Sequence, residues 1–377
     1  MSFLARPQNV FVRKASFQIH LWTGIVVCLY MVVIGVSGSI LVFERELGHL
    51  TFARLWKASA NSGRAIGFPQ AVAIVKSQFS DYQISAGYPP DLPGNNFEFL
   101  IRRGGQTRDV FLDAGTGRVA GEIDPAHSWI AWMIDLHFHL LAGRTGEVVN
   151  GVGGICLMLL CITGIVIWWP GIHGWTRGLK INLRARWKRI NFDLHSAIGF
   201  WSLLILFMWA FTGVYLVWDD PIESFVNRFS SVASANRPIV HVPPRGNVPW
   251  VDFAQMIQTA QQASPNAAFD GAFFPSDNKG PLILLMARSE QRNFRQSDYI
   301  FFDPSTGKML ALWHRGMPTT WGARFISLLT PLHFGYDWGL TIKIIWAVLG
   351  CALPILSITG ILMYWNRSLS KKWRARA

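Results

Sequence analysis

The chain has 377 residues, 51% of them hydrophobic, and a formal net charge of +13. Long apolar runs alternate with polar segments, which excludes an ordinary soluble protein and indicates one that crosses a membrane. The positive charge is confined to three short segments, so we attribute it to membrane orientation and exclude nucleic-acid binding.

Four apolar runs are long enough to span a bilayer, which requires roughly 20 residues in a helix. They lie at residues 17–43, 147–169, 193–218 and 340–365. All four cysteines fall in these runs, so we expect no disulfide in the segments between them. The predicted fold class is an α-helical membrane protein with a four-span bundle.

The basic residues predict the orientation. Residues 1–19, 170–191 and 366–377 contain fourteen Lys and Arg and no Asp or Glu. With four spans, all three segments lie on one side of the membrane. Because positively charged loops stay in the cytoplasm, we expect both termini inside and the two long connecting segments in the periplasm.

The long segments share an order of elements. In the first, we expect a helix at 69–79, strands at 82–88, 96–103 and 107–113, and a possible further strand after the turn Asp113–Gly117. In the second, we expect a helix at 251–263 and strands at 269–274, 281–288 and 298–303, followed by the matching turn Asp303–Gly307. Each segment is therefore predicted to form a small α+β domain.

The predicted divisions follow from these signals. They are an N-terminal segment with span one, a first periplasmic domain, an interfacial helix with span two, a basic cytoplasmic loop, span three, a second periplasmic domain, an interfacial segment with span four, and a basic tail. Their ranges are 1–43, 44–127, 128–169, 170–191, 192–218, 219–319, 320–365 and 366–377.

The two halves of the chain resemble each other. A shift of 175 positions places His20 on His195, and a shift of 196 positions places His137 on His333. We interpret this pattern as a tandem duplication of span, outer domain and span, with the halves related by an axis along the membrane normal.

Four histidines are matched by this repeat and are the candidate metal-binding residues. His20 and His195 open spans one and three near the cytoplasmic face, whereas His137 and His333 precede spans two and four near the outer face. Ionisable residues in spans are costly and are often functional, although a lone histidine is also commonly a hydrogen-bonded interior residue. Two imidazoles make an incomplete zinc site but a complete axial pair for a haem iron.

Repeated glycines support the same interpretation. Gly24 and Gly199 follow His20 and His195 by four residues, one turn along the same helix face, where a porphyrin would lie. Gly38, whose repeat partner is Gly213, returns to that face five turns after His20. Helix packing through small residues is the alternative explanation. No Cys-x-x-Cys-His motif is present, so the expected cofactors are two b-type haems.

His139 is a second choice to His137 as a ligand. It lies two residues away and points to the opposite side of a helix. Its repeat position is occupied by Gly335, and the sequence does not decide between the two histidines. The remaining histidines lack repeat partners, and we expect surface or hydrogen-bonding roles for them.

The four spans, the paired Asp-x-x-Thr-Gly-type turns and the His-x-x-x-Gly openings resemble the PepSY-associated transmembrane family over nearly the whole chain. Within it, the chain is similar to FoxB-type siderophore reductases of the bacterial inner membrane. The resemblance implies haem ligation by His20, His195, His137 and His333. It also implies a transmembrane ferric-siderophore reductase that takes electrons from a cytoplasmic or quinol donor, with no separate catalytic side chain.

Two other classes of function remain open. A haem-free metal or proton transporter would use the histidines directly and would require polar residues between the inner and outer pairs. A sensor or regulator would bind a peptide in its outer domains and would not depend on His20. An absorption spectrum distinguishes these alternatives from a haem protein.

Overall fold

The computed structural model describes residues 11–59, 66–171, 175–242, 252–276, 280–288 and 296–369. The chain forms two compact units, each assembled from both halves of the sequence. The helical unit comprises Met1–Glu44, Trp132–Ser224 and Leu328–Ala377, and the sheet unit comprises Arg45–Ala131 and Phe225–Ser327.

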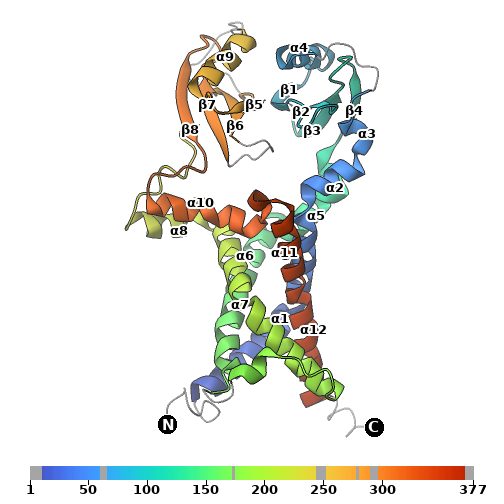
Figure 1. Cartoon of the computed structure of the whole chain (residues 1–377), viewed down its shortest axis with the longest axis vertical. Helices are drawn as coiled ribbons and strands as arrows, with labels where there is room; N and C mark the ends of the chain where they lie inside the picture. Colours follow the sequence, from blue (N-terminus) through green and yellow to red (C-terminus); the bar gives the residue numbers. More distant parts are fainter. Residues whose placement is uncertain are drawn as a thin grey trace. The chain divides into compact units, whose positions relative to one another are not determined.

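Four helices of membrane length run side by side in the helical unit (Figure 1). They are α1 (Phe11–Leu41), α6 (Gly143–Trp168), α7 (Trp187–Val217) and the pair α11 (Gly339–Gly350) and α12 (Ala352–Tyr364). Their mean hydropathy over the best window is 2.0 to 2.4, which confirms the four predicted spans and a multi-pass membrane protein.

The fourth span is interrupted, which the sequence analysis did not predict. Helix α11 ends at Gly350 and α12 begins at Ala352. Pro354 explains the break, because proline lacks an N–H and its ring collides with the carbonyl four residues earlier, here that of Gly350. A π-helical turn, η6 (Trp365–Leu369), follows α12.

The helix contacts place α1 and α7 on opposite corners of the bundle. Helix α6 packs against α1 and α7, and α12 packs against the same two helices. The interior between them is apolar, with a buried cluster that contains Val27, Met31, Cys161, Leu206 and Leu353. Side chains that reach across the bundle from α1 and α7 therefore meet at its centre.

Shorter helices flank the spans. Helices α5 (Trp129–His139) and α10 (Trp321–Phe334) precede spans two and four, where interfacial segments were predicted. Helices α2 (Glu44–Thr51), α3 (Ala53–Trp56) and α8 (Asp219–Asn227) follow spans one and three and were not predicted. In the described part of the chain, 3-10 turns also flank these helices: η2 (Pro125–His127), η3 (Trp175–Leu179) and η5 (Tyr336–Trp338).

The sheet unit contains eight antiparallel strands in the order β4-β3-β2-β1-β5-β6-β7-β8. The first half consists of helix α4 (Phe68–Gln78) and strands β1 (Gln83–Tyr88), β2 (Phe97–Arg103), β3 (Gln106–Leu112) and β4 (Val119–Ile123). The second half consists of α9 (Phe253–Ala263), β5 (Ala268–Phe273), β6 (Leu282–Ala287), β7 (Ser297–Phe302) and β8 (Met309–His314). Part of the predicted helix 251–263, at residue 251, lies outside the described residues.

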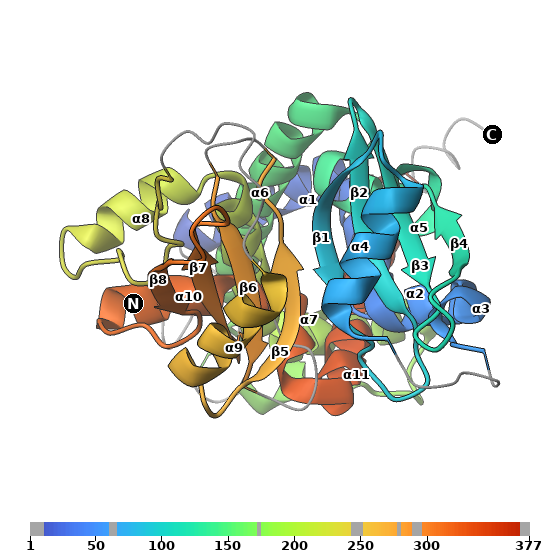
Figure 2. The same cartoon turned by 90° about the horizontal axis from the view of Figure 1, so that it is seen from above.

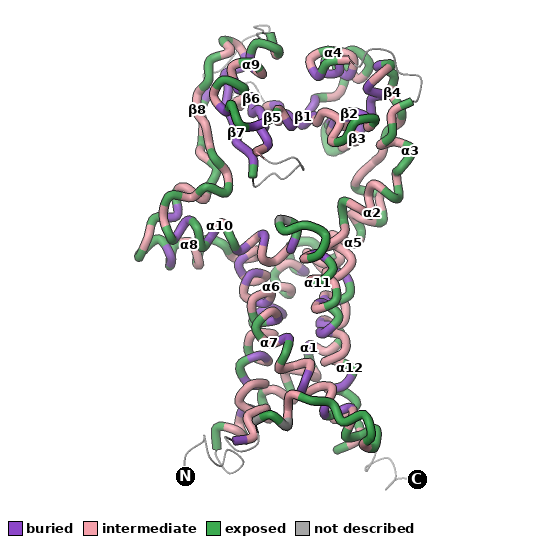
Figure 3. Tube along the Cα trace, viewed as in Figure 1, coloured by how far each residue is buried: buried purple, intermediate pink, exposed green. Residues whose placement is uncertain are grey.

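The two predicted α+β segments share one sheet, because β1 pairs with β5 through Ala86↔Phe273 and Gly87↔Ala272. Figure 2 shows α4 and α9 on the same face of the sheet. The buried side chains of Phe68 and Met256 on these helices pack with Phe99 and Phe302 on the strands in a single core. Strands β6 and β7 are buried along their whole length (Figure 3). The sequence of β6 is apolar throughout, whereas β7 begins with the buried polar residues Ser297 and Asp298.

Candidate functional site

The inner histidines meet across the bundle. His20 on α1 and His195 on α7 have ring centroids 6.4 Å apart and an interplanar angle of 84°, so the rings are not stacked. The Nδ1 of His20 lies 3.0 Å from the Thr163 hydroxyl on α6. The Nδ1 of His195 lies 2.9 Å from the Thr359 hydroxyl on α12.

The outer histidines form a second pair with the same construction. His137 on α5 and His333 on α10 also have ring centroids 6.4 Å apart, with an interplanar angle of 58°. Their Nδ1 atoms lie 2.8 Å from the Ser37 hydroxyl and 2.9 Å from the Thr212 hydroxyl. Ser37 follows His20 by seventeen residues on α1, so the pairs are separated by about 25 Å along the helix axis.

The four hydroxyl groups fix the tautomer of the histidines. Each hydroxyl donates its own proton to a backbone carbonyl of its helix, as Thr163 does to Leu159 at 2.7 Å and Ser37 does to Val33 at 2.7 Å. The same bond is made by Thr359 and Thr212, at 2.7 and 2.8 Å. A hydroxyl whose proton is committed accepts from the ring, so Nδ1 carries the proton and Nε2 keeps its lone pair for a metal.

A glycine beside each hydroxyl residue makes room for the ring. A Cβ on Gly38 would lie 2.9 Å from His137 Cε1, and one on Gly213 would lie 3.4 Å from His333 Cε1. A Cβ on Gly164 would lie 3.4 Å from His20 Cε1, and one on Gly360 would lie 3.4 Å from His195 Cε1. Gly38 and Gly213 were predicted to lie on the porphyrin face, whereas in the structure they accommodate the imidazoles.

A repeated dipeptide therefore marks the partners that the sequence analysis missed. Ser37-Gly38, Thr163-Gly164, Thr212-Gly213 and Thr359-Gly360 each place a hydroxyl and a hydrogen side chain against one histidine. Their shared spacing in the repeat was visible, but only the structure shows which histidine each one contacts.

Gly24 and Gly199 have a different environment. A Cβ on either residue would meet only a leucine methyl, at 3.8 Å for Gly24 and 3.6 Å for Gly199, which are ordinary contact distances. Both line a cavity of about 1690 Å³ that also contains His20 and His195. Packing within the protein does not require glycine at these two positions. The missing side chains therefore enlarge the cavity.

The donor set fits a haem iron. Among the described residues, no group of three or more His, Cys, Asp or Glu is placed to hold a metal ion. Each pair thus offers two nitrogen ligands, and a porphyrin supplies the other four. With metal–nitrogen bonds of about 2 Å and roughly 1 Å from nitrogen to ring centre, axial imidazoles have centroids roughly 6 Å apart, close to both observed separations.

His139 lies outside the outer pair. Its Nδ1 bonds to Asp135 on the same helix at 2.9 Å, and its side chain is 39% exposed. The arrangement favours His137 as the member that faces His333.

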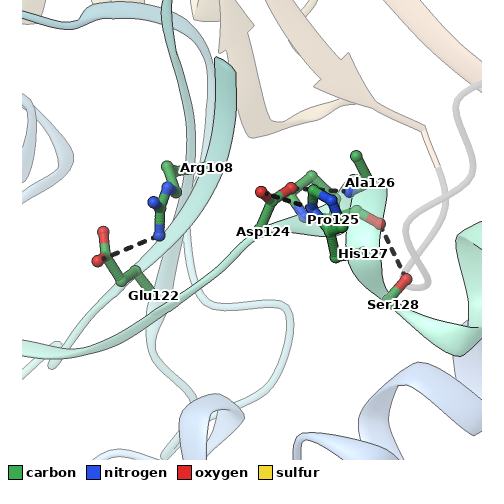
Figure 4. Close-up of polar contacts among 7 residues, drawn as sticks. All are labelled: Arg108, Glu122, Asp124, Pro125, Ala126, His127 and Ser128. Carbon is green, nitrogen blue, oxygen red and sulfur yellow. Dashed lines mark hydrogen bonds and ion pairs between the residues drawn. The ribbon is translucent and has the colours of Figure 1, made fainter.

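His127 is a surface residue of the sheet unit. Its Nδ1 lies 2.9 Å from Asp124, which also caps the turn η2 by accepting the Ala126 N–H (Figure 4). The His127 hydrogen bond holds the pKa of Asp124 below its usual range. Burial, and then the Asp124 charge, raise the pKa of Asp109 to about 6. The hydrogen bonds of Asp124 to His127 and Ala126 fix the chain just after strand β4. Among the described residues, they do not bring His127 to another histidine.

Comparison with known proteins supplies the family. Residues 17–367 match the PepSY-associated TM region. The chain belongs to this family. One relative of this PepSY-associated protein is an uncharacterized protein of Pseudomonas aeruginosa, 35% identical over 86 residues. The match covers 22% of the present chain and 20% of that relative, so the relative's function is not transferable.

Proposed function

We propose that this PepSY-associated protein is a two-haem, b-type oxidoreductase of the bacterial inner membrane. It moves electrons from a cytoplasmic or quinol donor to ferric siderophore iron at the periplasmic face. The two histidine pairs carry the proposal, since each has its Nδ1 atoms bonded to hydroxyl groups and its rings at an axial separation. His20 and His195 hold the inner haem, and His137 and His333 hold the outer haem.

When bound, each haem supplies a centre that accepts and releases one electron. The chain supplies the rest: hydroxyl groups that orient the imidazoles, helices that would keep water from the ligands, and histidine nitrogens that would set the potential. Release of iron follows from its reduction, because the ferrous ion is less charged and is held less tightly by hard oxygen ligands.

The orientation belongs to the same proposal. The basic segments support an orientation with both termini and the middle loop in the cytoplasm, and therefore with the sheet unit in the periplasm. The matched contacts around the two histidine pairs support a tandem duplication of the chain.

The bundle interior disfavours the transporter alternative. The described residues of the cluster between the two pairs are mainly Val, Met, Leu and Cys, with Tyr30 and Trp209 at its edge. Ion or proton pathways in membranes are lined by polar or ionisable groups. A pathway for electrons between bound haems needs no such lining.

The test is an absorption spectrum of the purified protein before and after dithionite, with haem content measured per chain. We expect a Soret band, sharp reduced α and β bands, and two haems per chain. His20→Ala and His333→Ala should each remove about one haem, and the double variant should be colourless, because a single imidazole leaves an axial position open.

His139→Ala is the matched control, since the ring of His139 bonds to Asp135 of its own helix. Its haem content and spectrum should equal those of the wild type. A wild-type protein with a flat spectrum, purified in folded form after haem-supplemented expression, would contradict the proposal.

A further inference from the structure

The cavity at the inner histidines has one charged end. Five cations line it, namely Arg13, Lys14, Lys188, Arg189 and Arg367. Among the described residues lining this cavity, one is acidic, Asp193, and it already pairs with Arg189 at 2.8 Å. Toward the bundle centre the lining is apolar and includes Val27, Met31 and Leu206. The cavity thus fits an amphipathic ligand with an apolar body and an anionic end.

Arg13 and Lys188 stand in equivalent positions. Each precedes its histidine, His20 or His195, by seven residues, which is two helical turns or about 10 Å along the same face. Both cations therefore lie on the cavity side of their helices, toward the basic end. One comes from α1 and the other from α7, on opposite corners of the bundle.

Arg13 is held with part of its guanidinium unsatisfied. Its Nη2 donates to the Ile167 carbonyl at 2.9 Å, which fixes the side chain against the end of α6. Its Nε is buried and has no hydrogen-bond partner in the protein. Arg13 lines the cavity, and a partly buried cation is stabilised by an anion beside it.

We propose that Arg13 and Lys188 bind the carboxylates of the inner porphyrin, so that the haem enters this site with its propionate edge toward the basic end and its apolar edge toward Met31. This inference rests on the proposed function for the presence of a haem, and adds the residues that select its orientation. Carboxylates suit the site because guanidinium and ammonium groups donate strong, charge-assisted hydrogen bonds to them. A lipid phosphate offers the same chemistry and is the competing occupant.

The test compares protohaem with its dimethyl ester, in which both carboxylates are blocked. Haem-depleted full-length protein in nanodiscs is titrated with each compound, and binding to a His20→Ala/His195→Ala variant is subtracted to isolate the inner site. Wild-type protein should bind the diacid about tenfold or more tightly than the diester. In Arg13→Gln/Lys188→Gln this ratio should approach one, because the groups that distinguish the compounds are gone.

Two variants guard against a structural explanation. Arg13→Lys keeps the charge and should retain most of the preference for the diacid. Arg184→Gln removes an exposed cation from the same basic loop, outside the cavity lining, and should leave the ratio unchanged.

Three results would overturn the assignment to porphyrin carboxylates. The first is equal binding of diacid and diester by the wild type, with a normal bis-imidazole spectrum. The second is an unchanged ratio in the double variant. The third is an effect of the Arg13 and Lys188 substitutions on diacid binding that is seen only in discs containing phosphatidylglycerol. That result would show that the two cations bind a lipid phosphate and not the porphyrin carboxylates. The proposed function itself fails in a different way, with no bis-imidazole spectrum from either compound.

Discussion

At the residue scale, the hydroxyl groups of Thr163 and Thr359 control the inner imidazoles. Each accepts an Nδ1–H bond while its own proton is held by a helix carbonyl. An imidazole whose N–H is hydrogen-bonded is a stronger donor through its other nitrogen. A stronger donor stabilises ferric over ferrous iron, so these hydroxyl groups are expected to lower the potential of a haem bound between His20 and His195.

The double variant Thr163→Val/Thr359→Val tests this effect with little change in side-chain shape. We expect the midpoint potential of one haem to rise and its affinity to fall by about 10- to 100-fold, while the other haem is unaffected. A potentiometric titration followed by absorbance measures both haems in one sample. Ser196→Ala is the control, because Ser196 lines the same cavity but bonds to the Gly178 carbonyl. If both midpoint potentials of the Val variant equal those of the wild type, the hydroxyl groups do not set the haem potential.

At the scale of elements, glycine serves two purposes on the same helix. On α1, Gly38 lies against the ring of His137. Gly24 lines the cavity, and a Cβ added there would be at an ordinary van der Waals distance from Leu160. Helix α7 repeats the arrangement with Gly213 and Gly199. Glycine at positions 38 and 213 is required by packing within the protein. Glycine at positions 24 and 199 is required only when a ligand fills the cavity.

Alanine substitutions separate these purposes. Gly24→Ala/Gly199→Ala should leave thermal stability close to that of the wild type, because the added methyl groups make only ordinary contacts with leucine side chains. It should reduce haem binding at the inner pair, because both positions line the cavity. Gly38→Ala should disturb the outer haem, because its methyl group would displace the His137 ring, and Gly213→Ala should have a smaller effect at 3.4 Å. Haem content per chain and thermal unfolding measure both. Full haem loading of the Gly24/Gly199 variant would show that the cavity face is not occupied by porphyrin.

At the scale of the whole molecule, the sequence predicted those features that depend on periodicity and repetition. Apolar runs predicted the spans, short apolar segments bounded by turn residues located six strands to within about one residue, and the repeat selected His20, His195, His137 and His333. Features that depend on tertiary contact were missed. The turn that separates α5 from α6 contains Leu140 and Leu141 at positive φ, 49° and 57°, which no local propensity favours.

The joint between the two halves of the sheet is another such feature. Strands β1 and β5 occupy equivalent places in their halves and pair with each other, so the eight strands are ordered symmetrically about this joint. The pairing is short and passes through glycine: Gly271 has a φ of 152°, and a Cβ there would lie 2.7 Å from Tyr88 Cδ1 and 2.8 Å from the Gly87 carbonyl oxygen. The two strands can approach this closely only because residue 271 has no side chain. The sequence pattern alone does not reveal which other strand will lie next to this glycine.

Gly271→Ala should therefore open the sheet at its centre. The methyl group would collide with a backbone oxygen that cannot move without breaking the β1–β5 pairing, and the conformation itself is strained for alanine, at a combined cost of about 2–5 kcal/mol. Hydrogen–deuterium exchange should show faster exchange of the amides of β1 and β5, while those of β3 and β7 remain protected. Gly105→Ala, in the β2–β3 turn with no atom within 4 Å of its Cβ, is the matched control and should leave exchange unchanged. Equal protection of β1 in both variants would show that the halves do not depend on this contact to form one sheet.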